Sequence, residues 1–188
     1  MGKSFILFSV AVCCLAASAS AVEVLNKEQA VKRMFLTSDN VAEEAKTLSG
    51  AQLDQVKALC GGKLYAIKKP DGVNEAQYTF IFGSKGGVKQ GVAVIEEEAD
   101  EWGPLQFIVV LDPASGKIIN AAMMQYVDAR SRDLANRAFL KGFFGKGATD
   151  PMTIGKDVDG VTGATVSSTV FCHLAKKVAA LYKVVYLK

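Results

Sequence analysis

Two threonines and two glycines with the potential to bind an anion precede the last apolar-periodic segment of the chain. They lie within residues 159–165, DGVTGAT, in which Thr165 offers a hydroxyl and Asp159 a carboxylate. Gly163 lacks a Cβ atom and therefore lets a bulky group approach the backbone. A turn that faces a helix N-terminus meets unpaired N–H groups and the positive end of the helix dipole, which favour phosphate. The same residues could also form a turn and nothing more.

The segment that follows this turn predicts an α-helix. Apolar residues recur there at helical spacing, and Ser167 or Ser168 is expected to cap the first free N–H groups of the helix. The residues of the predicted apolar face are Val166, Val170, Phe171, Leu174, Val178 and Leu181.

Residues 159–165 resemble the Asp-x-x-Ser/Thr-Gly-Ala-Thr/Ser signature of the FMN-binding domain family. This family includes the C subunit of the sodium-pumping NADH:quinone oxidoreductase and the G subunit of the Rnf complex. The resemblance implies that Thr165 carries FMN through a phosphoester bond formed by a dedicated flavin transferase. It also implies that Asp159, Thr162, Gly163 and Ala164 belong to the cofactor site.

The resemblance extends over roughly residues 103–182, and more loosely from residue 63. Residues 139–146, FLKGFFGK, are similar to a segment of the single-domain exported members. Members of the transmembrane complexes often carry Glu-Thr-Pro-Gly-x-Gly where residues 126–131, YVDARS, stand in this chain. Trp102 either stacks on the flavin, as the resemblance implies, or is a tryptophan of the core.

The middle of the chain predicts an antiparallel sheet, because β-forming runs alternate with turns at residues 84–87 and 112–116. Residues 24 to about 60 are predicted to be helical, with a capping box at Ser49 and Gln52. The expected fold class is α+β: a twisted antiparallel sheet with helices packed on it. The predicted strands are residues 64–67, 76–82, 88–95, 105–111 and 117–127.

The first residues resemble a secretory signal peptide, with Lys3, an apolar run over residues 5–17 and the small residues 19–21, ASA. Cleavage after residue 21 would start the mature chain at Val22, whereas an uncleaved segment would act as an anchor. Lipidation at Cys13 or Cys14 is not expected, because the residues before each are poor for a lipobox. We therefore expect residues 1–21 as signal peptide, 22–62 as an N-terminal helical segment and 63–188 as the FMN-binding domain.

Composition excludes several classes of function. The net charge is +3, and no basic run interleaves with aromatic residues, so nucleic acid is not an expected partner. His173 is the single histidine and has no companions at metal-ligand spacing, so no metal site is expected. Cys60 and Cys172 would remain after cleavage, and either form a disulfide or are two buried thiols.

Two charged segments leave alternatives open. The acidic residues 96–101 form either a solvated loop, the simpler interpretation, or a docking patch for a partner. Arg130, Arg132 and Arg137 form either a second anchor for the phosphate or the exposed face of a helix that begins at Ser131; the second alternative is favoured.

Together these features predict an exported flavoprotein that carries FMN covalently on Thr165. It would relay electrons in a membrane-associated or periplasmic redox chain, as an electron-transfer domain rather than a self-sufficient enzyme. Its expected partners are a flavin transferase for maturation and a redox protein, for example a membrane complex. The alternative is a non-catalytic exported FMN-binding or interaction module, such as a sensor or an assembly partner.

Overall fold

The structure is a computed structural model that describes residues 21–62, 77–101 and 103–187. Three of the predictions above therefore lie outside the described residues. They are the signal peptide apart from its last residue, the strand at residues 64–67, and the environment of Trp102.

The described part of the chain is built on one antiparallel sheet of six strands in the order β1-β6-β5-β4-β3-β2. With the helices described below, this arrangement confirms the predicted α+β class. The strands are β1 (Val22–Glu23), β2 (Asn40–Thr47), β3 (Gln77–Lys85), β4 (Val88–Asp100), β5 (Gly103–Leu111) and β6 (Ile118–Tyr126).

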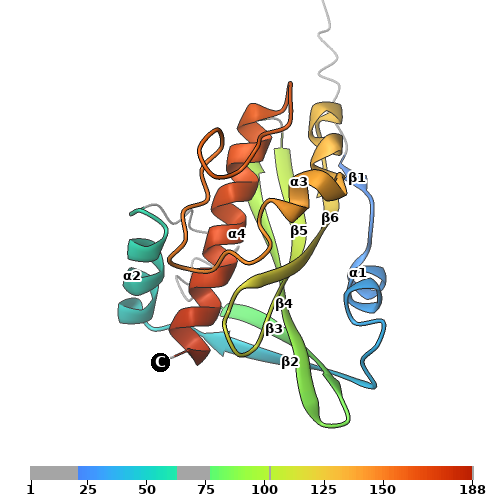
Figure 1. Ribbon diagram of the computed structural model, residues 1–188, viewed down its shortest axis with the longest axis vertical. Coiled ribbons are helices and arrows are strands. Elements are labelled where there is room, and N and C mark those ends of the chain that lie inside the picture. Colours follow the sequence, from blue (N-terminus) through green and yellow to red (C-terminus); the bar gives the residue numbers. More distant parts are fainter. Residues whose placement is uncertain (1–20, 63–76, 102, 188) are drawn as a thin grey trace, which may run out of the picture.

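Helices cover both faces of the sheet. The long helix α4 crosses one face with α2 at its side, while α1 lies on the other side of the sheet (Figure 1). The short helices η1 and α3 follow β6 at the end of the sheet where α4 begins (Figure 1). Their bounds are α1 (Lys27–Met34), α2 (Gly50–Leu59), the 3₁₀ helix η1 (Ala129–Ala135), α3 (Arg137–Lys141) and α4 (Thr165–Tyr186).

The predicted helical content of residues 24–60 is partly wrong. Capping boxes start α1 at Asn26 and α2 at Ser49, the latter as predicted. Between them, however, residues 40–47 form β2, which pairs with β3 along its full length. The partner strand overrides the local pattern, because ladder hydrogen bonds to β3 satisfy the backbone of a segment with few β-forming residues. The division into a 22–62 segment and a 63–188 domain stays a prediction.

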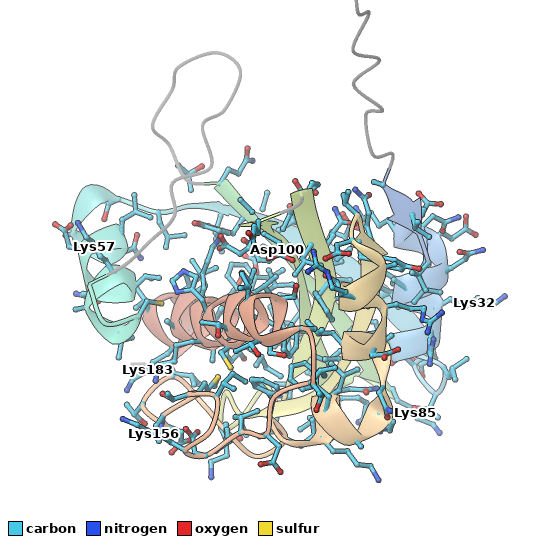
Figure 2. All side chains as sticks on the ribbon, turned by 90° about the horizontal axis from the view of Figure 1, so that it is seen from above. Lys32, Lys57, Lys85, Asp100, Lys156 and Lys183 are labelled. Carbon is cyan, nitrogen blue, oxygen red and sulfur yellow. The ribbon has the colours of Figure 1, made fainter. Side chains whose placement is uncertain are left out.

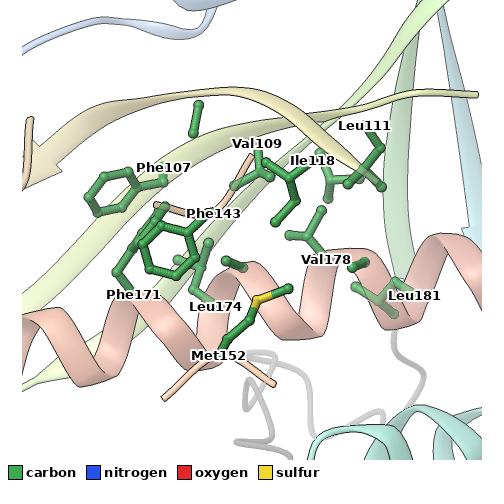
Figure 3. Close-up of a cluster of buried hydrophobic side chains, with 14 of the residues drawn as sticks. Phe107, Val109, Leu111, Ile118, Phe143, Met152, Phe171, Leu174, Val178 and Leu181 are labelled. Atoms are coloured by element: carbon green, nitrogen blue, oxygen red, sulfur yellow. The ribbon is translucent and has the colours of Figure 1, made fainter. Parts of the chain in front are cut away.

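Alternate side chains of the central strands point to opposite faces of the sheet and pack into two separate cores. The larger core lies between the sheet and α4, where Phe107 of β5 meets Phe171 of α4 with ring centroids 4.3 Å apart (Figure 3). Phe143 also packs edge-on against Phe171 with centroids 4.7 Å apart. The smaller core lies under α1 and includes Phe35, Ile81 and Ile108. The helical face predicted for α4 is buried at Phe171, Leu174, Val178 and Leu181, half-buried at Val170, and wrong at Val166, which is 51% exposed.

The acidic run is not a solvated loop, because β4 continues through it to Asp100. Glu96 and Glu98 point toward α4 and are each only 5% exposed. Lys177 of α4, fully buried, lies 2.6 Å from Glu96 Oε2 and 2.7 Å from Glu98 Oε1. Burial raises the pKa of Glu96, whereas the two carboxylates hold the pKa of Lys177 above its usual range despite burial. This buried ion-pair cluster connects α4 to β4.

Among the helices that the structure describes, none combines the length and the hydropathy that a membrane span requires.

Both described cysteines are free, so the structure favours two thiols over a disulfide. Burial raises the pKa of Cys60 to about 11 and that of Cys172 to about 12, and the thiolate is the reactive form.

We therefore expect both cysteines to resist iodoacetamide in the folded protein at pH 7 and to be alkylated after denaturation. Alkylation of the folded protein should accelerate as the pH rises. The expectation would be contradicted if, after denaturation without a reductant, iodoacetamide alkylated neither cysteine.

Candidate functional site

Thr165 is the first residue of α4, and its helix end carries no side-chain cap. The N-cap residue is Ala164, which makes no side-chain hydrogen bond. The prediction that Ser167 or Ser168 caps the helix is therefore wrong. The first N–H groups of a helix have no partner within the helix, so those of α4 are left for solvent or a ligand.

Ser168 instead supports the preceding turn. Its hydroxyl oxygen accepts a hydrogen bond from the Val161 N–H at 3.1 Å, and the hydroxyl donates to the Ala164 carbonyl at 2.8 Å. Gly163 in this turn has φ +80°, a left-handed conformation that favours glycine. A Cβ atom on Gly160 would lie 2.8 Å from Ile154, so this position needs glycine for space. The Ser168 hydroxyl thus holds the turn in place, while Thr165 remains exposed.

Ser167 takes part in a buried hydrogen-bond network beneath the first turn of α4. Its hydroxyl donates to Asp100 Oδ2 at 2.5 Å, and Ser131 Oγ of η1 lies 2.8 Å from Ser167 Oγ. Asp100 is labelled in Figure 2, which looks down on the molecule from above. The network therefore joins the end of β4, η1 and the start of α4.

A cavity of about 210 Å³ opens beside Thr165. Arg130 reaches this cavity, and its Nε donates to Asp128 Oδ2 at 2.7 Å. Among the described residues, none forms a hydrogen bond with the Thr165 hydroxyl. The lining residues are Glu101, Asp128, Arg130, Gly163, Ala164, Thr165, Val166 and Ser167.

The three arginines of the predicted exposed helical face have different surroundings in the structure. Arg130 alone of the three lines the Thr165 cavity. Arg137 donates to Asn120 Oδ1 at 2.7 Å and lies over the Phe144 ring, and Arg132 pairs with its neighbour Asp133. The helix that holds Arg130 is 3₁₀ and is capped by Asp128, and Ser131 is buried rather than at its start. All three arginines are exposed and lie in η1 or α3, as the favoured alternative predicted, although the helix begins at Ala129 and not at Ser131.

Asp159 and Thr162 line a second cavity, of about 520 Å³, on the other side of the turn. Phe139 and Asn136 of the α3 region also line it. Asp159 is exposed, and within the described residues its carboxylate accepts no hydrogen bond. The structure therefore brings Thr165, Gly163 and Ala164 together on one cavity and leaves Asp159 and Thr162 on another.

The site contains no evident metal centre. Within the described part of the chain, no group of three or more His, Cys, Asp or Glu side chains is arranged to hold a metal ion.

Comparison with known protein families identifies the domain that contains this site. The family described as FMN-binding domain matches residues 101–180. The chain contains an FMN-binding domain. It is accordingly a flavin-binding protein of the electron-transfer type. The match spans β5, β6, η1, α3, the Thr165 turn and most of α4, and no curated protein matches the chain.

The described residues fit the phosphate end of FMN. An uncapped helix N-terminus, a guanidinium and an exposed hydroxyl face one cavity, and each is a recurrent partner of phosphate. The cavity volume of about 210 Å³ lies below the roughly 300–1,000 Å³ of sites that enclose a drug-sized ligand. It therefore has room for the phosphate and adjoining atoms, while the ring system would lie outside it.

Sequence reasoning missed the support of this site. Asp100 was grouped with an acidic loop, and Ser131 was assigned only as a helix start. No local signal connects residues 100, 131 and 167, because their contacts depend on the packing of three elements.

Proposed function

We propose that this protein is an exported flavoprotein that carries FMN on Thr165 and relays electrons to a redox partner. The observation that carries the proposal is the exposed Thr165 hydroxyl, without an intramolecular partner in the described chain, at the uncapped start of α4 within an FMN-binding domain. A hydroxyl so placed is accessible to an incoming phosphorus centre. The N–H groups beside it favour the phosphate that results.

Attachment requires a group transfer that balances. The Thr165 oxygen forms a bond to the phosphorus of the FMN moiety in a dinucleotide such as FAD, and the diphosphate bond of the donor breaks. AMP leaves, and the hydroxyl proton passes to a base. We expect a flavin transferase to supply this base and any metal ion that the transfer needs.

Once attached, the cofactor supplies the redox chemistry, and this chain supplies binding and orientation. Arg130 would contact the phosphate through a guanidinium that Asp128 already orients. Because the cavity holds only one end of the cofactor, the ring would remain accessible to a partner protein. Such an arrangement suits electron relay more than turnover of an enclosed substrate.

Export is supported by the position of the expected cleavage site. Val22, the proposed mature N-terminus, is the first residue of β1, which pairs with β6. Cleavage after residue 21 would thus leave the described helices and strands intact. Covalent attachment also suits an extracytoplasmic location, where a dissociated cofactor would be lost.

The proposal is tested by producing the full chain together with a flavin transferase and isolating it from the extracytoplasmic fraction. We expect an N-terminus at Val22 and a yellow colour that stays with the chain after acid denaturation. The intact mass should exceed that of the chain by one FMN less water. Colour that is released by acid would support the alternative of a module that holds FMN non-covalently.

Asp159 provides a separate prediction about attachment. Because its exposed carboxylate accepts no hydrogen bond in the described structure, Asp159→Asn should change the free energy of unfolding by no more than about 0.5 kcal/mol. We expect the same variant to load FMN at least about tenfold more slowly, through lost interaction with the transferase or its metal ion. Loading rate and thermal unfolding are measured on the same preparation. Full loading with a clear loss of stability would make Asp159 a structural residue.

A further inference from the structure

A buried chain of hydroxyls lies beneath the first turn of α4 and ends on a carboxylate. Ser167 Oγ donates to Asp100 Oδ2 at 2.5 Å. Ser131 Oγ lies 2.8 Å from Ser167 Oγ and 3.3 Å from Asp100 Oδ2. Asp100 Oδ2 is therefore within hydrogen-bond distance of both hydroxyls, and the two hydroxyls are within hydrogen-bond distance of each other. The two hydroxyls and the carboxylate form one connected network.

The chain of hydroxyls is held firmly. Ser131 is fully buried and Ser167 is 4% exposed, so loss of the Asp100 carboxylate would remove the charged acceptor of two buried hydroxyls. The other carboxylate oxygen of Asp100 accepts the Glu101 N–H at 2.8 Å. A charged acceptor binds a hydroxyl roughly twice as strongly as a neutral one, which makes Asp100 the anchor of the network.

Each member of this network is adjacent in sequence to a residue that lines the Thr165 cavity. Asp100 precedes Glu101, Ser131 follows Arg130, and Ser167 itself lines the cavity after Thr165 and Val166. A shift in the network would therefore move Arg130 relative to the start of α4.

We propose that Asp100, Ser131 and Ser167 are positioning residues for flavin attachment. They fix the first turn of α4 against η1. The Thr165 hydroxyl, the uncapped N–H groups and Arg130 can then all contact the same phosphate. The three residues act through Thr165 and Arg130. This inference rests on the proposed function, since it concerns how the same site accepts its cofactor.

The test compares Ser167→Ala and Asp100→Asn with a control in the same helix. Val178→Ala removes buried methyl groups from α4 away from its N-terminus and should destabilise the fold. The purified full chain is incubated with FAD, Mg²⁺ and a flavin transferase, and initial rates of FMN attachment are measured. We expect both network variants to load on the order of 10–100-fold more slowly, since small misplacements cost such factors, and Val178→Ala to load like wild type. The double variant should be no slower than the slower single variant, because the residues act as one unit.

A second measurement reports on the chain without flavin. Amide hydrogen exchange at residues 168–170, the first N–H groups of α4 that bond to carbonyls one turn earlier, should accelerate in both network variants and stay unchanged in Val178→Ala. Wild-type loading rates in the network variants would overturn the inference, as would an equal loss of rate in Val178→Ala. A wild-type chain that accepts no covalent flavin would contradict the proposed function itself, and this inference with it.

Discussion

Thr165→Val is expected to abolish covalent flavin loading and leave the fold intact. Valine has nearly the shape of threonine but no hydroxyl, so the phosphoester cannot form. The side chain is exposed and makes no hydrogen bond within the described chain, so the free energy of unfolding should change by about 0.5 kcal/mol or less. Loading is measured as flavin absorbance that stays with the acid-denatured chain.

Two further variants make this result specific to the hydroxyl of Thr165. Thr165→Ser restores a hydroxyl at the same position and should recover loading. Thr162→Ala, in the same turn but on the other cavity, should reduce loading only mildly. Loss of loading in Thr162→Ala together with loading of Thr165→Val would show that the motif has been placed on the wrong threonine.

Lys177→Met should destabilise the fold strongly. Removal of the buried ammonium leaves Glu96 and Glu98 buried without a counter-charge, and such a loss typically costs about 3–5 kcal/mol. The corresponding fall in Tm is on the order of 10 °C for a chain of this size. Thermal unfolding followed by circular dichroism measures it.

A compensating variant separates the buried charges from the packing of Lys177. Replacing the whole cluster, as Lys177→Met with Glu96→Leu and Glu98→Leu, should recover most of the lost stability, because no charge remains buried. Comparable destabilisation of the single and the triple variants would show that side-chain packing, and not charge pairing, accounts for the loss.

The parts of the fold that the sequence predicted depend on local interactions. Gly86 and Gly87 both have positive φ in the turn between β3 and β4, as a short hairpin turn requires. The capping box of Ser49 and Gln52 and the turn closed by Asp112 also involve residues close in sequence. The start of α4 at Thr165 follows from the turn before it and the apolar period after it.

The parts that the sequence did not predict depend on distant partners. β2 forms because β3 pairs with it. Glu96 and Glu98 of the acidic run are buried because they pair with Lys177, which lies 79 residues from Glu98 in sequence. Ser167 likewise binds a distant partner, Asp100, 67 positions away in sequence, and does not cap its own helix end. The motif thus located the threonine, whereas its supporting network became apparent only from the packing of β4, η1 and α4.

The position of the flavin is the central claim, and peptide mapping tests it most directly. The chain is produced with a flavin transferase, denatured and digested with trypsin, which releases residues 157–176 after cleavage at Lys156 and Lys176. We predict that this peptide carries one FMN less water and that fragmentation places the added mass on Thr165. An unmodified peptide from a chain that has been exposed to active transferase, or a flavin on Thr162 or on a serine, would contradict the account.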